Sequence, residues 1–202
     1  MPGKKAVFAG TMQVPGISVP VRIICSGRRT LGVKVDAGGT VTVQAPFGTR
    51  EQDIVTFLCK QAGRIEEYVR QSRQTAEQAE AAGLFSEDAI RHMAEQARQV
   101  IPGRVAYYAK LLGVSYGTIT IRNQRSRWGS CTSRGNLNFN CLLMAAPPEV
   151  LDSVVAHELC HRKHMNHSGA FYAELYRVFP DYDRCRTWLR EQGPLLMRRM
   201  TG

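Results

Sequence analysis

The chain has 202 residues, of which 44% are hydrophobic, and its 27 Lys and Arg residues outnumber its 17 Asp and Glu residues, for a formal net charge of +10. This length suits one compact domain or two small ones that share a core, and no apolar run approaches the roughly 20 residues that a membrane-spanning helix needs. The basic N-terminus is followed by too short an apolar stretch for a signal peptide, so we expect a cytoplasmic protein that does not enter membranes.

The N-terminal part of the chain predicts β-structure. Its first 46 residues are rich in Val, Ile and Thr, and apolar and polar side chains alternate along them, as is typical of half-buried strands. Turns that contain glycine separate consecutive strands, so we expect a β-meander. The predicted strands are 17–26, 30–36 and 40–45.

A helix is expected directly after these strands. Thr49 and Gln52 match a capping box, in which two side chains satisfy backbone N–H groups of the first helical turn. From 71 to 82 the chain is rich in Ala, Glu and Gln, which predicts either a solvated extension of this helix or a linker. The apolar face of the helix includes Ile54, Phe57, Leu58, Ile65 and Val69.

A second long helix is predicted to begin after Ser86, its N-cap, and to end at Gly113. Pro102 should kink or interrupt it, because proline lacks the N–H that the helix needs. Nearer the C-terminus, Ser168 and Asp181 are the expected N-caps of two further helices.

Two strands are predicted between the long helix and the C-terminal helices, over 117–123 and 137–140. The loop or hairpin between them carries Trp128. If the strand 137–140 lies at an edge of its sheet, its free backbone groups could pair with an extended peptide.

Four of the five histidines lie within the eleven residues 157–167. The Pro147-Pro148 pair is expected to begin a buried helix here, on which His157 and His161 project from the same face, one turn apart. Two such imidazoles can bind one zinc ion at about 2 Å. Glu158 can then reach a water on the ion without being a ligand, so the pattern predicts a catalytic zinc site with its own general base.

A catalytic zinc site needs a third protein ligand and one open position. His167 is the favoured candidate, since its spacing from His161 equals the ligand spacing in the His-Glu-x-x-His-x-x-Gly-x-x-His proteins. His164 would lie too far along the axis of a continuing helix. Glu174, on the next helix, is the weaker alternative.

Five short motifs follow one another closely in this part of the chain: RSRWGSC at 125–131, GNLNFN at 135–140, APPEVLD at 146–152, HELCH at 157–161 and MNHSGAF at 165–171. Together they resemble the YgjP-like metallopeptidase domain, a bacterial group allied to the SprT-like proteases within the zincins. A weaker similarity extends upstream to 28–36 and 43–46. The resemblance implies a peptidase whose presumed zinc ligands match His157, His161 and His167, and whose catalytic residue matches Glu158.

These patterns predict an α+β protein with a β-rich region and a long helix over 1–82. A zincin-like catalytic domain follows over 83–202 and should combine the zinc-binding helix with a small antiparallel or mixed sheet and C-terminal helices. A cationic or hydroxyl-bearing neighbour would stabilise the oxyanion. The candidates for this role or for substrate contact are His164, Arg127, Trp128 and Tyr172.

The positive charge favours polyanions and acidic protein surfaces as partners. A basic cluster around the metal helix predicts either a cleft rim that contacts nucleic acid or an acidic substrate, or only solvated and paired side chains. The cluster consists of Arg122, Arg125, Arg127, Arg134, Arg162 and Lys163. His92 is expected at the surface, and Cys160 should pack in the core, as one of six free thiols.

Two other functions remain open beside a peptidase that acts on peptides or proteins. A metal-dependent nucleotide or phosphoester hydrolase would suit the basic charge, although carboxylates are scarce near these histidines. A nucleic-acid-binding or protein-binding module with a structural zinc would need four protein ligands that leave no open position on the ion, with His164 as the fourth.

Overall fold

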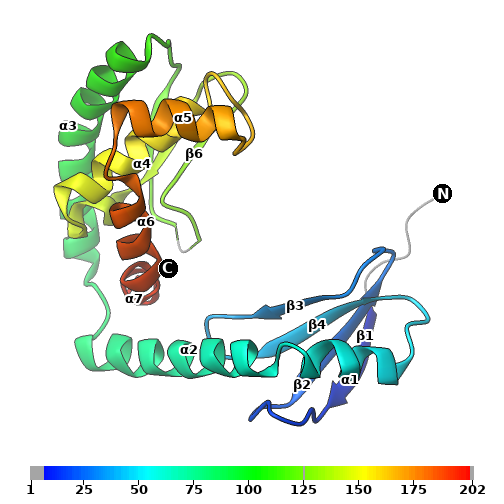
Figure 1. Ribbon diagram of the computed structural model, residues 1–202. Coiled ribbons are helices and arrows are strands. Elements are labelled where there is room, and N and C mark those ends of the chain that lie inside the picture. The colour runs from blue at the N-terminus through cyan, green and yellow to red at the C-terminus, as the bar shows by residue number, and fades with distance from the viewer. Residues whose placement is uncertain (1–6, 125, 201–202) are drawn as a thin grey trace. The chain divides into compact units, whose positions relative to one another are not determined.

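The structure is a computed structural model that describes residues 7–124 and 126–200 (Figure 1). Contacts divide the chain into two compact units, Met1–Gln78 and Ala79–Gly202. The predicted division into functional domains between residues 82 and 83 stays a prediction. Arg125, one member of the predicted basic cluster, lies outside the described residues.

The first unit is built on four strands: β1 (Val7–Met12), β2 (Val21–Ser26), β3 (Gly32–Val35) and β4 (Val41–Pro46). Where a simple meander would place β3 beside β2, β4 occupies that position, parallel to β2 and antiparallel to β3, in the order β1-β2-β4-β3. The reason is burial. Val41, Val43 and Ala45 of β4 are fully buried, whereas β3 is shorter and only partly buried, so the more apolar strand takes the interior position.

Two helices, α1 (Glu51–Cys59) and α2 (Ala62–Ala82), share one apolar core with this sheet (Figure 1). The predicted capping box does not form. Thr49 Oγ1 donates instead to the carbonyl oxygen of Pro46 at 2.9 Å, in the turn that leaves β4, and Arg50 is the N-cap. Residues 71–82 are helical and mostly exposed, so they are the solvated extension of α2 rather than a linker.

In the second unit, α3 (Glu87–Leu112) has the predicted ends. The Ser86 hydroxyl accepts the N–H of Ala89 at 3.1 Å, and Gly113 ends the helix with a φ of 66°, in the left-handed region that favours glycine. Pro102 lies inside α3 without interrupting it. The helix continues because its buried stripe holds both halves against one core: Met93, Ala97, Ile101, Val105 and Leu112.

A small mixed sheet follows, with strands β5 (Ile119–Arg122), β6 (Gly129–Cys131) and β7 (Leu137–Asn140). The order is β5-β7-β6, in which β7 is parallel to β5 and antiparallel to β6. The strand 137–140 is therefore central, and the prediction that it could form an edge is wrong. Its Leu137 and Phe139 are buried, which favours the interior, and β6 is an edge strand that contacts α4 (Pro148–Cys160).

The remaining elements are η1 (Cys141–Ala145), α4 (Pro148–Cys160), α5 (Gly169–Val178), α6 (Tyr182–Glu191) and α7 (Gly193–Arg198). Pro148 begins α4 as predicted, and most of this helix is buried, including Cys160. The Ser168 hydroxyl caps α5, but Asp181 makes no side-chain cap to α6, and α7 adds a helix that was not predicted. The α+β class is confirmed. None of the helices in the described ranges combines the length and apolar content that a bilayer crossing requires.

Candidate metal centre

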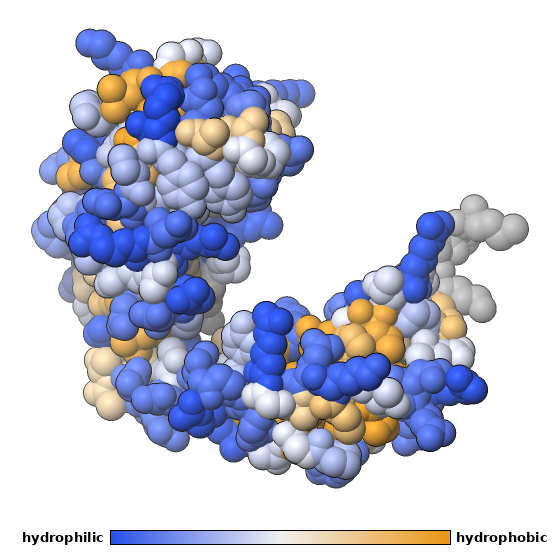
Figure 2. Space-filling model, viewed as in Figure 1, coloured by the Kyte–Doolittle hydropathy of each residue, from blue (hydrophilic) through white to orange (hydrophobic). Residues whose placement is uncertain are grey.

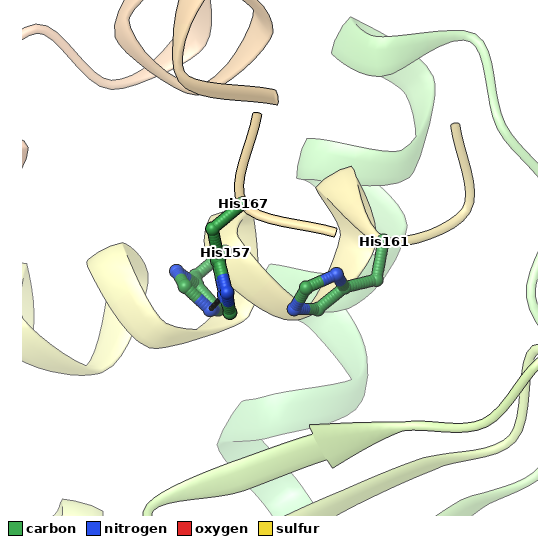
Figure 3. Close-up of side chains that lie close together, drawn as sticks. All are labelled: His157, His161 and His167. Carbon is green, nitrogen blue, oxygen red and sulfur yellow. Dashed lines mark hydrogen bonds between the residues drawn. The ribbon is translucent and has the colours of Figure 1, made fainter. Parts of the chain in front are cut away.

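Three histidines converge at the C-terminal end of α4 (Figure 3). His157 lies in the last turn of the helix, His161 is its C-cap, and His167 comes from the loop before α5. One ring nitrogen from each lies within 4.8 Å of those of the other two, and the Nε2 atoms of His157 and His167 are 3.0 Å apart. Helical spacing accounts for the first two side chains, and the turn that ends α4 brings in the third.

Hydrogen bonds at the far side of two rings fix their orientation. His161 Nδ1 donates to the carbonyl oxygen of His164 at 3.0 Å, so its Nε2 keeps a free lone pair. His157 Nδ1 lies 2.9 Å from the Tyr182 hydroxyl, which can accept its proton in the same way. Partners of this kind set the tautomer of metal-binding histidines and hold their rings in place.

Phe171 forms the apolar base of the cluster. It is fully buried, and its ring centroid lies 5.0 Å from that of His157, 4.8 Å from that of His161 and 4.9 Å from that of His167. Burial in this setting, with repulsion from the other two histidines, lowers the pKa of His157 to about 3. The ring is therefore neutral at physiological pH, as a metal ligand must be.

These donors fit a divalent ion such as zinc. Nitrogens that bind one tetrahedral zinc at 2.0–2.1 Å are about 3.4 Å apart, which is close to the spacing of the Nε2 atoms of His157 and His167. Three imidazoles also form a donor set that zinc accepts in catalytic sites. The identity of the ion stays a prediction.

Glu158 lies beside the cluster and is only 7% exposed. Burial raises the pKa of its carboxyl group to about 7, although the charge of Arg127 and a hydrogen bond from the backbone of Cys131 work in the opposite direction. A Cβ atom added to Gly129 would lie 2.8 Å from both Cγ and Oε1 of Glu158. The absence of a side chain at Gly129 therefore leaves the space that the carboxylate occupies.

The edge strand β6 directs backbone groups toward the same side, where the Cys131 N–H bonds to the Glu158 carboxylate. The carbonyl oxygen of Trp128 accepts the Asn140 N–H at 2.8 Å, and the Thr132 N–H donates to Asn136 at 2.9 Å. Because bonded positions alternate along an antiparallel pair, the backbone groups of Gly129 and Cys131 point away from β7, toward the open edge.

The structure separates the other predicted site residues. The Tyr172 ring centroid lies 6.3 Å from that of His167, and Arg127 is exposed and close enough to lower the pKa of Glu158. His164 contributes its carbonyl oxygen, and the half-buried Trp128 ring packs against Gly193. Roles for these four residues in substrate contact stay predictions.

The alternative third ligand, Glu174, is engaged elsewhere. Its carboxylate forms ion pairs with Lys163 at 3.2 Å and Arg177 at 2.8 Å. It does not belong to the metal-competent group, that is, the side chains whose donor atoms lie close enough together to hold one ion. Arg162 of the basic cluster is also engaged, since it donates to the carbonyl oxygens of Ser115 and Ser133.

The remaining described members of the basic cluster, Arg122, Arg127 and Arg134, are exposed. The cluster is thus partly structural, with Arg162 and Lys163 paired, and partly solvated. His92 is exposed on α3, as expected.

Sequence reasoning missed three residues that shape the site: Tyr182, Phe171 and Gly129. Tyr182 lies 25 residues beyond the histidine that it contacts, and no local pattern marks it. The other two fall within the motifs at 165–171 and 125–131, so the motifs contained them without indicating what they contact.

The chain is similar to a known domain family and to two solved structures. Residues 85–192 match the model of the YgjP-like metallopeptidase domain. Among solved structures, the chain is similar to the metallopeptidase zymogen abylysin of Pyrococcus abyssi, with 22% identity over 45% of this chain and 96% of that chain and a TM-score of 0.40. It is also similar to the zymogen jannalysin of Methanocaldococcus jannaschii, with 22% identity over 46% and 95% of the two chains and a TM-score of 0.42. The search of curated proteins gave no match. Because the family model matches more than half of the chain, the protein belongs to the YgjP-like metallopeptidase domain family.

Proposed function

We propose that the chain is a zinc-dependent peptidase, with residues 83–202 as its catalytic domain. His157, His161 and His167 are the metal ligands, and Glu158 is the general base. The observation that carries this proposal is the convergence of three imidazole nitrogens within 4.8 Å of one another, beside a carboxylate that is buried next to an open strand edge.

Zinc, when bound, supplies a Lewis acid that polarises a peptide carbonyl and lowers the pKa of water toward 7. Glu158 takes the proton of the attacking water and passes it to the leaving amine. Its raised pKa, about 7, suits both transfers near neutral pH. Tyr172, beside His167, and Arg127, whose charge acts on Glu158, are the candidates to stabilise the oxyanion.

The substrate peptide is proposed to lie along β6. The outward N–H and C=O groups of Gly129 and the outward C=O group of Cys131 can pair with an extended chain, which would bring its carbonyl groups past Glu158. This assigns to β6 the pairing that the sequence suggested for 137–140.

Two alternatives have less support. A phosphoester hydrolase would favour a carboxylate-rich site, whereas the metal-competent group among the described residues contains histidines alone. A structural zinc would need a fourth protein ligand, and His164, the candidate, is not in the group of described residues whose donor atoms lie close enough together to hold an ion. Nucleic acid as a partner of the basic surface, and the oligomeric state, stay open.

Metal analysis and a peptide digest test the proposed function. The purified chain is expected to hold one zinc per molecule and, when loaded, to cut members of a peptide library that the Glu158→Gln variant leaves intact. Cleavage of a nucleoside triphosphate or phosphoester, without cleavage of any peptide, would favour the phosphoester alternative.

Tyr182→Phe is expected to weaken zinc binding by about 10–100-fold, because it removes the hydroxyl that orients His157 and keeps the ring. A competition titration with a chromophoric chelator measures the change. The matched control is Tyr176→Phe, whose hydroxyl donates to Asp183 at the surface. Equal effects of the two variants would contradict a role for Tyr182 in positioning His157.

Gly129→Ala is expected to lower kcat by at least tenfold while zinc stays bound, because the new methyl group would lie 2.8 Å from the Glu158 side chain. Because Glu158 is buried, it can make room for this methyl group only by moving out of the position that it occupies as the proposed general base. Gly103→Ala, where a Cβ meets nothing within 4 Å, is the control for glycine replacement. Steady-state kinetics and zinc stoichiometry are measured together, and unchanged kcat would mean that Glu158 tolerates displacement.

A further inference from the structure

The first unit has a groove that the proposed function does not use. It lies between the edge strand β3 and helix α2 and has a volume of about 310 Å³. Val33 and Val35 line it on the sheet side, and Arg64, Ile65 and Tyr68 line it on the helix side. Tyr68 is 49% exposed although its ring borders an apolar surface. Figure 2 shows orange, hydrophobic side chains among the blue ones on the unit that contains the four-stranded sheet.

The open edge of β3 runs along this groove. Within the described residues β3 pairs with β4 alone, and the Asp36 N–H donates to the carbonyl oxygen of Thr40 at 3.0 Å. Backbone groups alternate in direction along a strand, so Lys34 also faces β4, whereas Val33 and Val35 direct their N–H and C=O groups outward. Two donors and two acceptors thus face the open side of the groove, in the spacing that an added strand would match.

The groove also carries uncompensated positive charge. The guanidinium of Arg64 lies 5.8 Å from the centre of the Tyr68 ring, and no carboxylate pairs with it in the part of the chain that the structure describes. Neighbouring acids have other partners: Glu67 is bonded to Arg70, and Glu66 accepts the backbone N–H of Ser18. A carboxylate that approached Arg64 from outside would therefore meet no competing acid.

We propose that this groove binds an extended, acidic segment of a partner polypeptide. The segment adds a fifth strand beside β3, where Val33 and Val35 supply the main-chain hydrogen bonds. One of its apolar side chains packs between Ile65 and Tyr68, and an Asp, Glu or terminal carboxylate pairs with Arg64. The site lies within residues 33–72 and does not depend on the metal centre, so it can exist whether or not the chain is a peptidase.

Selection from a library of random eight-residue peptides tests this proposal. The bait is the full chain with Glu158→Gln, which prevents cleavage of bound peptides. Selected peptides are expected to alternate apolar with polar residues and to contain Asp or Glu. The strongest binder is then synthesised with a fluorescent label and titrated by anisotropy.

Two variants locate the binding. Val35→Pro removes an N–H that faces the open edge and leaves the bonds to β4 in place, so it should weaken binding at least tenfold. Arg64→Glu should do the same by reversing the charge. Arg22→Glu changes an exposed cation on β2, which β4 separates from β3, and should change the affinity less than twofold. If Val35→Pro does not fold, as judged by circular dichroism, Tyr68→Ser on the exposed face of α2 replaces it.

Three results would overturn the proposal. The library could yield no binder, it could yield basic peptides, or the selected peptides could bind all the groove variants as tightly as the parent. Sedimentation of the protein without peptide measures its oligomeric state and tests for a fourth result. A dimer that Val35→Pro or Tyr68→Ser dissociates would show that a second copy of this chain occupies β3, which also contradicts a separate partner.

Discussion

Glu158→Gln is expected to lower kcat/KM for peptide hydrolysis by on the order of 10²–10⁴-fold while zinc binding stays at the parent level, because a general base contributes rate enhancement of that size. Glutamine has nearly the same shape as glutamate and can occupy the space beside Gly129, but it cannot accept the proton of the attacking water. The measurements are steady-state kinetics on one cleaved peptide and zinc content by mass spectrometry.

The control for this experiment is Glu174→Gln. Its carboxylate pairs with Lys163 and Arg177 rather than with the metal cluster, so hydrolysis and zinc binding should both survive. Undiminished turnover by Glu158→Gln would end the proposed mechanism. Loss of zinc from Glu174→Gln would return Glu174 to the list of ligands and weaken the assignment of His167.

The Glu158 carboxylate should make the metal-free protein less stable as the pH rises. The pKa of Glu158 is raised from 4.5 to about 7 in the folded state. Below pH 4.5 the group is protonated in both the folded and the unfolded chain. Between pH 4.5 and 7 the unfolded chain releases the proton more readily than the folded chain. The free energy of unfolding therefore falls by on the order of 3 kcal/mol by pH 8.

Glu158→Gln removes this penalty. In the metal-free state the variant should therefore be more stable than the parent at pH 8, and the difference should shrink toward zero near pH 4.5. Urea denaturation of both proteins, with a chelator present, measures the free energy of unfolding at each pH. A difference that does not change with pH would show that Glu158 is not buried in its charged form.

The sequence predicted the helix that carries the candidate site because the spacing of the candidate residues coincides with helical periodicity. His157, Glu158 and His161 lie within five residues, and helical geometry alone places the two rings on one face. The ends of α3 were predictable for the same reason, since Ser86 and Gly113 act through bonds to their own turns. Such features need no knowledge of distant parts of the chain.

Features that depend on distant contacts could not be predicted in this way. The position of β4 between β2 and β3 reflects the relative burial of strands, which a single strand does not reveal. The strand β6 lies at the edge of the second sheet, but its three residues are too few to show the alternation of apolar and polar side chains that predicts a strand. The bond from Tyr182 to His157 joins two helices, so only the packing of α6 beside α4 reveals it.

Removal of a ligand should have the other large effect. Replacement of His157, His161 or His167 by Ala is expected to weaken zinc binding by on the order of 10²–10⁴-fold. Proteins bind such an ion with a free energy of roughly 10–16 kcal/mol. One ligand of three or four contributes about a third or a quarter of that free energy, which corresponds to this loss of affinity. Peptide hydrolysis should be lost with the metal. Competition with a chromophoric chelator measures the affinity of each variant.

His167→Ala is the most informative of the three, because His167 lies in an exposed loop and its loss should leave the fold intact. Its matched control is His164→Ala. The carbonyl oxygen of residue 164, not its side chain, accepts the bond from His161, so this variant keeps that contact and should bind zinc as the parent does. If His164→Ala lost as much affinity as His167→Ala, the ion would have four protein ligands. A closed site of that kind favours a structural zinc over catalysis, so this pair of variants separates the peptidase from the binding module.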